Sequence, residues 1–315
     1  MPDINPAKPS KETINQILEH MSDVFRNLPR SPILHKPSEA GLVYENISFP
    51  SIDGIPLEGW FIPCKNSEKV IIANHPMGFT RSGLPAHLEP WKSVWCASGN
   101  DFEVNFIPDY KILHDAGYNV LAYDLRNHGH SSAANGGIIS TGIYESRDVL
   151  GSINYIRNRK GTNKMKIGLF SRCLGCDATF YAMQSNPEVF NQVSCLVGAQ
   201  PVSEEIILSK QLSLAGIPKE RLKDLNELIV LKTSLSIAER DAREWAKSVC
   251  IPTFLYQVSD DVLTSPTDVQ TMFDNIPSED KQLQWIPDTT VRWNGYLEFQ
   301  KRPEPMLDWF QKHMQ

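Results

Sequence analysis

Residues 165–184 combine an apolar run, a turn of small residues and a second apolar run. The pattern predicts a buried strand over 165–170 and a helix over 176–184. Between them, the small residues Ser171 and Gly175 flank Cys173 at a spacing of two. Small flanking residues let strand and helix approach closely around a strained turn. The turn would present the Cys173 thiol at a helix N-terminus, where the helix dipole favours the thiolate. The sequence therefore predicts a reactive thiol at Cys173.

Apolar strand patterns alternate with amphipathic helix patterns along most of the chain. Strands are expected at 69–74, 119–124, 165–170, 193–199, 253–258 and 283–286, and helices at 110–116, 143–159, 176–184, 266–275 and 303–313. The segments 42–49 and 51–63 together predict a hairpin around the Asp53-Gly54 turn. Parallel strands need crossover connections. The sequence therefore predicts an α/β fold with a mostly parallel sheet covered by helices on both faces.

Two further segments flank or interrupt this expected core of 42–202 and 249–315. Residues 1–41 carry an apolar stripe at helical spacing, from Ile14 to Phe25, and predict a helical extension that docks on the domain or on a partner. Residues 203–248 are helical and too long for one crossover. We interpret them as a lid over the strand ends, with ordinary packing helices as the alternative.

Composition excludes several classes of function. The net charge is −6 and no block of five or more Lys or Arg occurs, so no nucleic-acid or anionic-membrane surface is expected. A secretory signal and an 18-residue apolar run are missing, which predicts a soluble, cytoplasmic protein. The six cysteines are scattered and predict reduced thiols without a metal site. No cofactor is expected, and the oligomeric state is left open.

The order of these features over residues 42–315 resembles the α/β-hydrolase superfamily, whose elbow is usually G-x-S-x-G. The resemblance implies that Cys173 is the nucleophile, and a cysteine at this position is similar to the dienelactone-hydrolase-like and polyketide acyl-transfer branches. The resemblance implies that His75-Pro76-Met77-Gly78 matches the loop that completes an oxyanion hole. The Met77 N–H would be one donor and the Leu174 N–H the other, since Pro76 has no N–H.

Two more segments carry the resemblance. Residues 124–131 look like the D-x-R-G-H-G-x-S segment that braces the active-site loops, which gives His128 a structural role. Residues 259–266 resemble the turn that presents the acid of the catalytic triad. The spacing to Pro266 favours Asp261 as that acid, with Asp260 as the fallback.

The resemblance fails where the superfamily places its catalytic histidine. Residues 286–296 contain no histidine, and His313, beyond them, is expected to be solvent-exposed on the final helix. Three explanations are open. A cation, Arg172 or Arg292, stabilises a thiolate; a displaced histidine, His75, serves as the base; or the site is inactive.

The favoured function is therefore a cysteine-dependent acyl-processing enzyme. It would hydrolyse, transfer or cyclise the acyl group of a small-molecule ester or thioester, free or presented by a carrier protein. Aromatic residues within 84–108 would line an apolar acyl pocket. One alternative is a catalytically inactive pseudo-hydrolase that binds a small apolar ligand or a partner protein. Another is thiol redox through Cys173 and Cys176.

Overall fold

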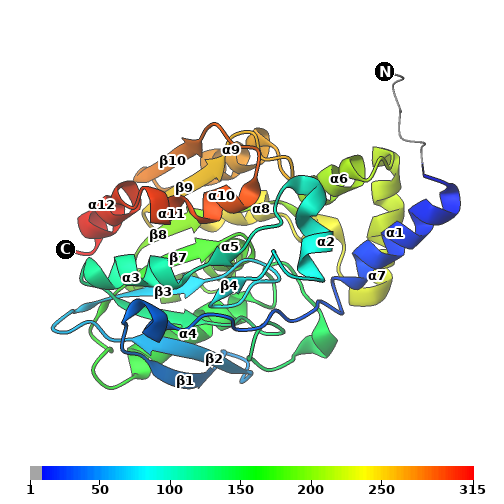
Figure 1. Cartoon of the computed structure of the whole chain (residues 1–315). Helices are drawn as coiled ribbons and strands as arrows, with labels where there is room; N and C mark the ends of the chain where they lie inside the picture. Colours follow the sequence, from blue (N-terminus) through cyan, green and yellow to red (C-terminus); the bar gives the residue numbers. More distant parts are fainter. Residues whose placement is uncertain (1–8) are drawn as a thin grey trace.

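A twisted sheet of eight strands forms the centre of the molecule in the computed structural model, which describes residues 9–315 (Figure 1). The strands are β1 (Glu45–Pro50), β2 (Pro56–Ile62), β3 (Lys69–Asn74), β6 (Asn119–Tyr123), β7 (Lys166–Arg172), β8 (Val193–Ala199), β9 (Thr253–Val258) and β10 (Lys281–Ile286). Their order in the sheet is β1-β2-β6-β3-β7-β8-β9-β10. β2 runs antiparallel to both of its neighbours, and the pairs from β6 to β10 are parallel. Two short strands, β4 (Gly83–Leu84) and β5 (Val104–Asn105), form a separate ribbon.

Helices cover both faces of the sheet, as the alternating pattern predicted. They are α1 (Lys11–Asp23), α2 (Trp91–Trp95), α3 (Ile107–Asp115), α4 (Ser146–Asn158), α5 (Leu174–Ser185), α6 (Glu204–Leu214), α7 (Leu222–Thr233), α8 (Ala242–Trp245), α9 (Pro266–Asn275), α10 (Arg292–Tyr296), α11 (Glu298–Lys301) and α12 (Glu304–His313). One apolar cluster packs α3 and α10–α12 against one face, and a second packs α4, α5, α8 and α9 against the other. Neighbouring strand residues alternate between the two clusters because successive side chains point to opposite faces. None of the described helices has the length and apolar character needed to cross a membrane.

The N-terminal helix and the expected lid share a third apolar cluster. α1 packs against α7, and the cluster joins Leu18 and Phe25 to Leu208, Leu212 and Ile229 of α6 and α7. These three helices lie together beyond one end of the sheet (Figure 1). We call α1, α6 and α7 the cap.

The expected segment boundaries need one correction. The predicted lid reached residue 248, but Ala242, Trp245 and Ala246 pack in the cluster beneath the sheet. This end of the segment therefore belongs to the core, because its large side chains are buried against α5 and α9. Residues 1–8 of the expected extension lie outside the described part of the chain.

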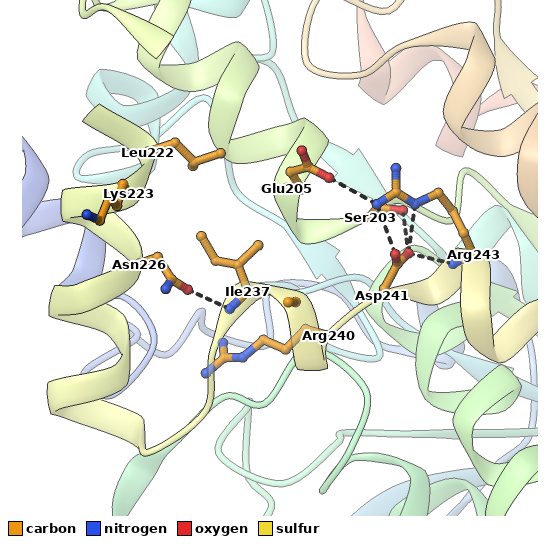
Figure 2. Close-up of a pocket in the computed structure, with 10 residues that line it drawn as sticks. Ser203, Glu205, Leu222, Lys223, Asn226, Ile237, Arg240, Asp241 and Arg243 are labelled. Atoms are coloured by element: carbon orange, nitrogen blue, oxygen red, sulfur yellow. Dashed lines mark hydrogen bonds and ion pairs between the residues drawn. The ribbon is translucent and has the colours of Figure 1, made fainter. Parts of the chain in front are cut away.

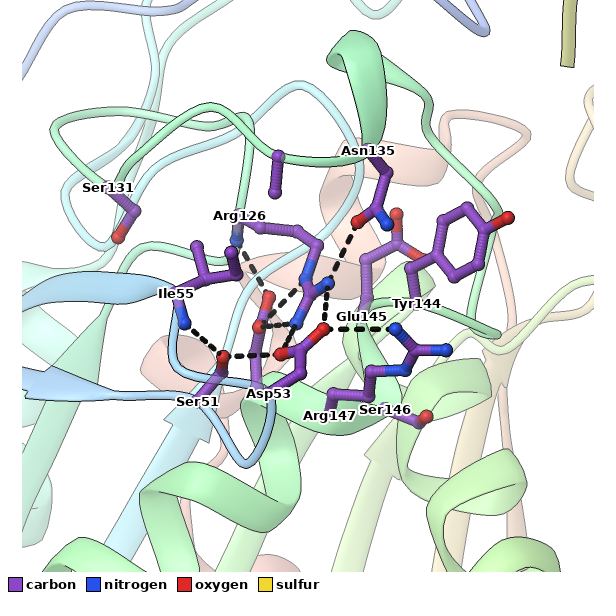
Figure 3. Close-up of polar contacts among 12 residues, drawn as sticks. Ser51, Asp53, Ile55, Arg126, Ser131, Asn135, Tyr144, Glu145, Ser146 and Arg147 are labelled. Carbon is purple, nitrogen blue, oxygen red and sulfur yellow. Dashed lines mark hydrogen bonds and ion pairs between the residues drawn. The ribbon is translucent and has the colours of Figure 1, made fainter.

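A buried arginine after the carboxyl end of β6 connects the sheet to α4 in the helical layer below it (Figure 3). Arg126 follows β6, and its Nε and Nη2 donate to the Asp148 carboxylate of α4 at 2.9 and 2.7 Å. Its Nη2 also donates to Asp53, in the β1–β2 turn, at 2.7 Å. Arg126 and Asp148 are fully buried, so each charge depends on the other for compensation. Arg147 reaches the same Asp53 carboxylate from the exposed side at 3.0 Å.

Arg126→Met should therefore lower the free energy of unfolding by about 3–5 kcal/mol, because it leaves the buried Asp148 carboxylate without its cation. Denaturant unfolding of both variants measures the loss. The matched control is Arg147→Met, which removes an exposed cation from the same network and should cost no more than about 1 kcal/mol. Equal losses in the two variants would contradict the structural importance of the buried pair.

Candidate active site

Cys173 occupies the turn between β7 and α5. Its backbone angles are φ 47° and ψ −116°, a conformation that a residue with a side chain rarely adopts. Its N–H donates to the Ala199 carbonyl of the adjacent strand β8 at 2.8 Å, which holds the turn against the sheet. Gly175 permits the tight packing, because a Cβ atom there would lie 2.6 Å from the Cβ of Asn74. The backbone is therefore that of the predicted elbow.

The two expected oxyanion donors both lie at the carboxyl ends of neighbouring parallel strands. β3 and β7 are neighbours, and Asn74 pairs with Ser171. Met77 and Leu174 each follow three residues later, so both come beyond the carboxyl ends of the strands. Within residues 9–315, neither of these backbone N–H groups has a hydrogen-bond partner. Both residues line the cavity that Cys173 also lines.

Arg292 stands where the catalytic histidine was expected, at the first residue of α10. Its Nη1 lies 2.8 Å from the Oδ2 atom of Asp261, and both side chains are at most 2% exposed. Asp261 is further fixed by the N–H of Leu263 at 2.9 Å. The alternative acid, Asp260, is exposed on the same turn. The geometry thus favours Asp261 over Asp260, and its partner is a guanidinium.

Gln200 and Gly295 hold α10 against the sheet edge. The Gln200 carbonyl accepts from Nη2 of Arg292, and its side-chain amide donates to the Arg292 carbonyl at 2.7 Å. A Cβ atom at Gly295 would lie 2.4 Å from the Gln200 amide carbon. Only glycine therefore allows the helix to approach this closely.

Tyr296 joins the arginine to the thiol. The Nε of Arg292 donates to the Tyr296 hydroxyl at 3.0 Å, and this hydroxyl lies beside the Cys173 thiol. Burial raises the pKa of Tyr296 well above its usual value, and negative charge on Cys173 adds to the rise while Arg292 opposes it. Burial alone would lower the pKa of Arg292, but Tyr296, Cys173 and Asp261 raise it well above its usual value. The guanidinium is therefore a permanent positive charge beside the thiol.

His75 is not placed to act as the displaced base. Its Nδ1 donates to the Pro76 carbonyl at 2.7 Å, and its Nε2 accepts from the Leu125 N–H at 2.9 Å. Burial first, and then the neighbouring His128 ring, lower the pKa of His75 well below its usual value. Both ring nitrogens are committed to the backbone, so His75 is a structural residue.

Two other expected side chains also lie elsewhere. Arg172 is fully buried, with its Nη2 2.5 Å from the Asp109 carboxylate and its guanidinium over the Phe170 ring. It is therefore paired within the core instead of serving the thiol. His313 is not solvent-exposed as expected, because it is 9% exposed and lies 3.6 Å from Asp280. Asp280 directly precedes β10, so His313 lies near the amino ends of the parallel strands, whereas the elbow lies at their carboxyl ends.

A cavity of about 550 Å³ opens over Cys173. Its apolar wall comes from the cap and from α2, and includes Ile17, Met21, Trp91, Trp95, Ile207 and Leu208. The aromatic insertion thus contributes Trp91 and Trp95 to the pocket, as predicted. Asp177 and Glu204 also line the cavity. No group of three His, Cys, Asp or Glu side chains among residues 9–315 is arranged to hold a metal ion.

A second cavity of about 330 Å³ lies within the segment 203–243 (Figure 2). Three of its charged groups pair with one another, since Arg243 lies 2.8 Å from Asp241 and 3.0 Å from Glu205. None of the predicted site residues lines it. The chemistry is therefore concentrated in the larger cavity.

Three residues of the site were not predicted from the sequence: Gln200, Tyr296 and Asp177. The order Arg292-Trp-Asn-Gly295-Tyr296 gave a weak signal, because an isolated glycine can mark a position where another part of the chain approaches the backbone closely. Asp177 lies four residues after Cys173, and this closeness in sequence was the only signal that it gave. Gln200 gave no signal in the sequence.

Comparison with known proteins identifies the architecture. No protein-family model and no curated protein matches the sequence. The fold is similar to that of the Pyrococcus furiosus esterase Pf2001, with a TM-score of 0.67 and 19% identity over 92% of this chain and 99% of that one. It is also similar to the α/β hydrolase GrgF of a Penicillium species (TM-score 0.57, 16% identity, 87% and 99% covered). A dienelactone hydrolase of Anabaena variabilis gives a TM-score of 0.54 at 14% identity, with 87% and 99% covered. The chain therefore has the α/β-hydrolase fold.

Proposed function

We propose that the protein is a cysteine-dependent acyl-processing enzyme that acts on an ester or thioester through an acyl intermediate on Cys173. One observation carries the proposal. The strained Cys173 lies in the wall of a largely apolar cavity that Met77 and Leu174 also line, and the backbone N–H groups of these two residues have no partner among residues 9–315. An acyl chain fits such a cavity, and the two unpartnered N–H groups would serve as donors to a carbonyl oxygen that gains charge.

The first step is attack of the Cys173 sulfur on the acyl carbonyl carbon. A C–S bond forms, the carbonyl oxygen becomes an oxyanion beside the Met77 and Leu174 N–H groups, and the bond to the leaving alcohol or thiol then breaks. Before attack, negative charge on the sulfur is stabilised by the Arg292 guanidinium. The Tyr296 hydroxyl accepts from Arg292, so its own proton is free to point at the sulfur.

The missing imidazole favours acyl transfer or cyclisation over hydrolysis. Arg292 holds its proton at all working pH values and cannot activate water as a histidine does. A thiol tolerates this replacement because its thiolate is accessible near neutral pH, whereas the alkoxide of serine is not. Similar folds support the substrate class, since one belongs to an esterase and another to a dienelactone hydrolase. The acyl donor is a small molecule, free or carried by a protein.

Cys173→Ala should abolish turnover of a p-nitrophenyl ester, because no other thiol lies in the elbow. Intact-protein mass spectrometry should show an acyl adduct on the wild type and none on the variant. Cys250→Ala, which removes an exposed thiol, is the matched control and should keep full activity. Full activity of Cys173→Ala would disprove the assignment of the nucleophile. A folded wild type that forms no adduct with any ester would favour the ligand-binding pseudo-hydrolase.

Tyr296→Phe should lower kcat/KM about tenfold to a hundredfold, because it deletes the hydroxyl beside the sulfur and keeps the packing of the ring. The control is Tyr181→Phe, on the far side of α5, which should leave the rate unchanged. Steady-state kinetics with one ester measure both variants. A Tyr296→Phe enzyme with wild-type kcat/KM would remove the tyrosine from the mechanism.

The redox alternative has little structural support. Cys173 packs in the cluster above the sheet and Cys176 in the cluster below it, and Cys176 is fully buried. Burial raises the pKa of the Cys176 thiol well above its usual value, and Asp177 adds to the rise.

Iodoacetamide at neutral pH should therefore modify Cys173 much faster than Cys176, because Cys173 faces a cavity and Cys176 does not. Peptide mass spectrometry of the labelled, folded protein measures the two rates. A disulfide between the two residues in protein isolated without reductant would instead support the redox function.

A further inference from the structure

Asp177 is a buried carboxyl group in the wall of the catalytic cavity. It lies four residues after Cys173, in the first turn of α5, and its N–H donates to the Cys173 carbonyl at 2.9 Å. Both line the 550 Å³ cavity, and Asp177 is 3% exposed. Among residues 9–315, the single hydrogen bond to its side chain is a long one, from the Val202 N–H at 3.4 Å. No described cation forms an ion pair with it.

Such a carboxyl group is expensive to bury, because a carboxylate in an apolar wall needs a cation or several donors. Burial raises the pKa of Asp177 well above its usual value. Negative charge on Cys173 and then on Asp268 adds to the rise, whereas the Val202 N–H and Arg292 oppose it. Asp177 and the Cys173 thiol thus disfavour carrying negative charge at the same time. The two groups are arranged to share one proton.

Three other titratable groups around the cavity are already committed. Arg292 cannot release its proton, and His75 has both ring nitrogens bonded to the backbone. Glu204 also lines the cavity and its pKa is raised by burial, but its side chain bonds Thr141. Of the described carboxyl groups in the cavity wall, Asp177 is the one within a helical turn of Cys173.

We propose that Asp177 is the acid–base residue of the site and takes over the proton transfer that the absent histidine would perform. The inference rests on the proposed function. Before acylation, the Cys173 thiol gives its proton to the Asp177 carboxylate, and the resulting thiolate then attacks the acyl carbon to form the C–S bond. The Asp177 carboxylic acid then gives that proton to the leaving oxygen or sulfur as its bond to carbon breaks.

Deacylation runs the same sequence in reverse. The acceptor alcohol, thiol or amine gives its proton to the Asp177 carboxylate and attacks the acyl carbon, and the C–S bond breaks. The released sulfur then recovers the proton from Asp177. Charge and protons balance in each half of the cycle without any additional reactant. Arg292 and Tyr296 stabilise the charge on sulfur, and Asp177 moves the proton.

The test compares Asp177→Asn with wild type on two butanoate esters, the phenyl and the p-nitrophenyl ester. Removal of a general acid–base group should lower kcat/KM about 10²- to 10⁴-fold for the phenyl ester. The loss should be about tenfold or more smaller for the p-nitrophenyl ester, whose phenolate leaves without a proton. Asp177→Glu, which keeps a carboxyl group, should recover part of the phenyl ester activity. Glu205→Gln, at a partly exposed carboxylate on α6 outside this cavity, is the matched control and should match wild type.

Iodoacetamide labelling of Cys173 separates this role from a structural one. Asp177→Asn removes a negative charge near the sulfur, so alkylation of Cys173 should stay as fast as in wild type or become faster. Equal losses on the two esters together with slower alkylation would show that Asp177 only supports the fold, and would overturn the proposal. Full activity of Asp177→Asn beside an inactive Cys173→Ala would overturn the role of Asp177 and leave the proposed function standing. An active Cys173→Ala would instead overturn the proposed function itself.

Discussion

The buried ion pair between Asp261 and Arg292 determines the geometry of the site. Two charged side chains that are almost completely excluded from solvent must remain together, because separating them would leave each charge without compensation. The pair connects the turn after β9 to α10, and Gln200 fixes the same arginine from the end of β8. α10 is thereby held over the elbow, with Tyr296 beside the thiol. The position of the thiol's neighbours is thus a consequence of one electrostatic constraint.

The replacement of an imidazole by a guanidinium separates two tasks that one histidine would combine. A guanidinium stabilises negative charge and cannot accept a proton. In our proposal, Arg292 and Tyr296 stabilise the negative charge on the sulfur, and Asp177 transfers the proton. The division suits a thiol nucleophile, because its thiolate forms near neutral pH with electrostatic help alone.

Much of this fold followed from sequence. Strands β8 and β9 begin and end where the apolar runs do, and the spacing Ser171-x-Cys173-x-Gly175 predicted the elbow with its strained residue. Local patterns are informative here because a buried strand and a tight turn each demand particular residue types. The short helices α10 and α11 were not predicted, since helices this short depend on packing and not on periodicity. Arg292 was recognised only as a possible cation, because its partner Asp261 is brought to it through space by the ends of two adjacent strands. His75 remained one of three open explanations for the same reason: nothing local in the sequence shows that the Leu125 N–H binds its ring nitrogen.

The most direct test of Cys173 as the nucleophile is the structure of the protein trapped with a slowly reacting acyl donor, such as a long-chain acyl fluoride. We expect an acyl group on the Cys173 sulfur, with its carbonyl oxygen between the Met77 and Leu174 N–H groups. The apolar chain should lie in the cavity beneath the cap and α2, and the Arg292–Asp261 pair should be intact. An acyl group on any other side chain, or a carbonyl oxygen turned away from both N–H groups, would contradict the central claim.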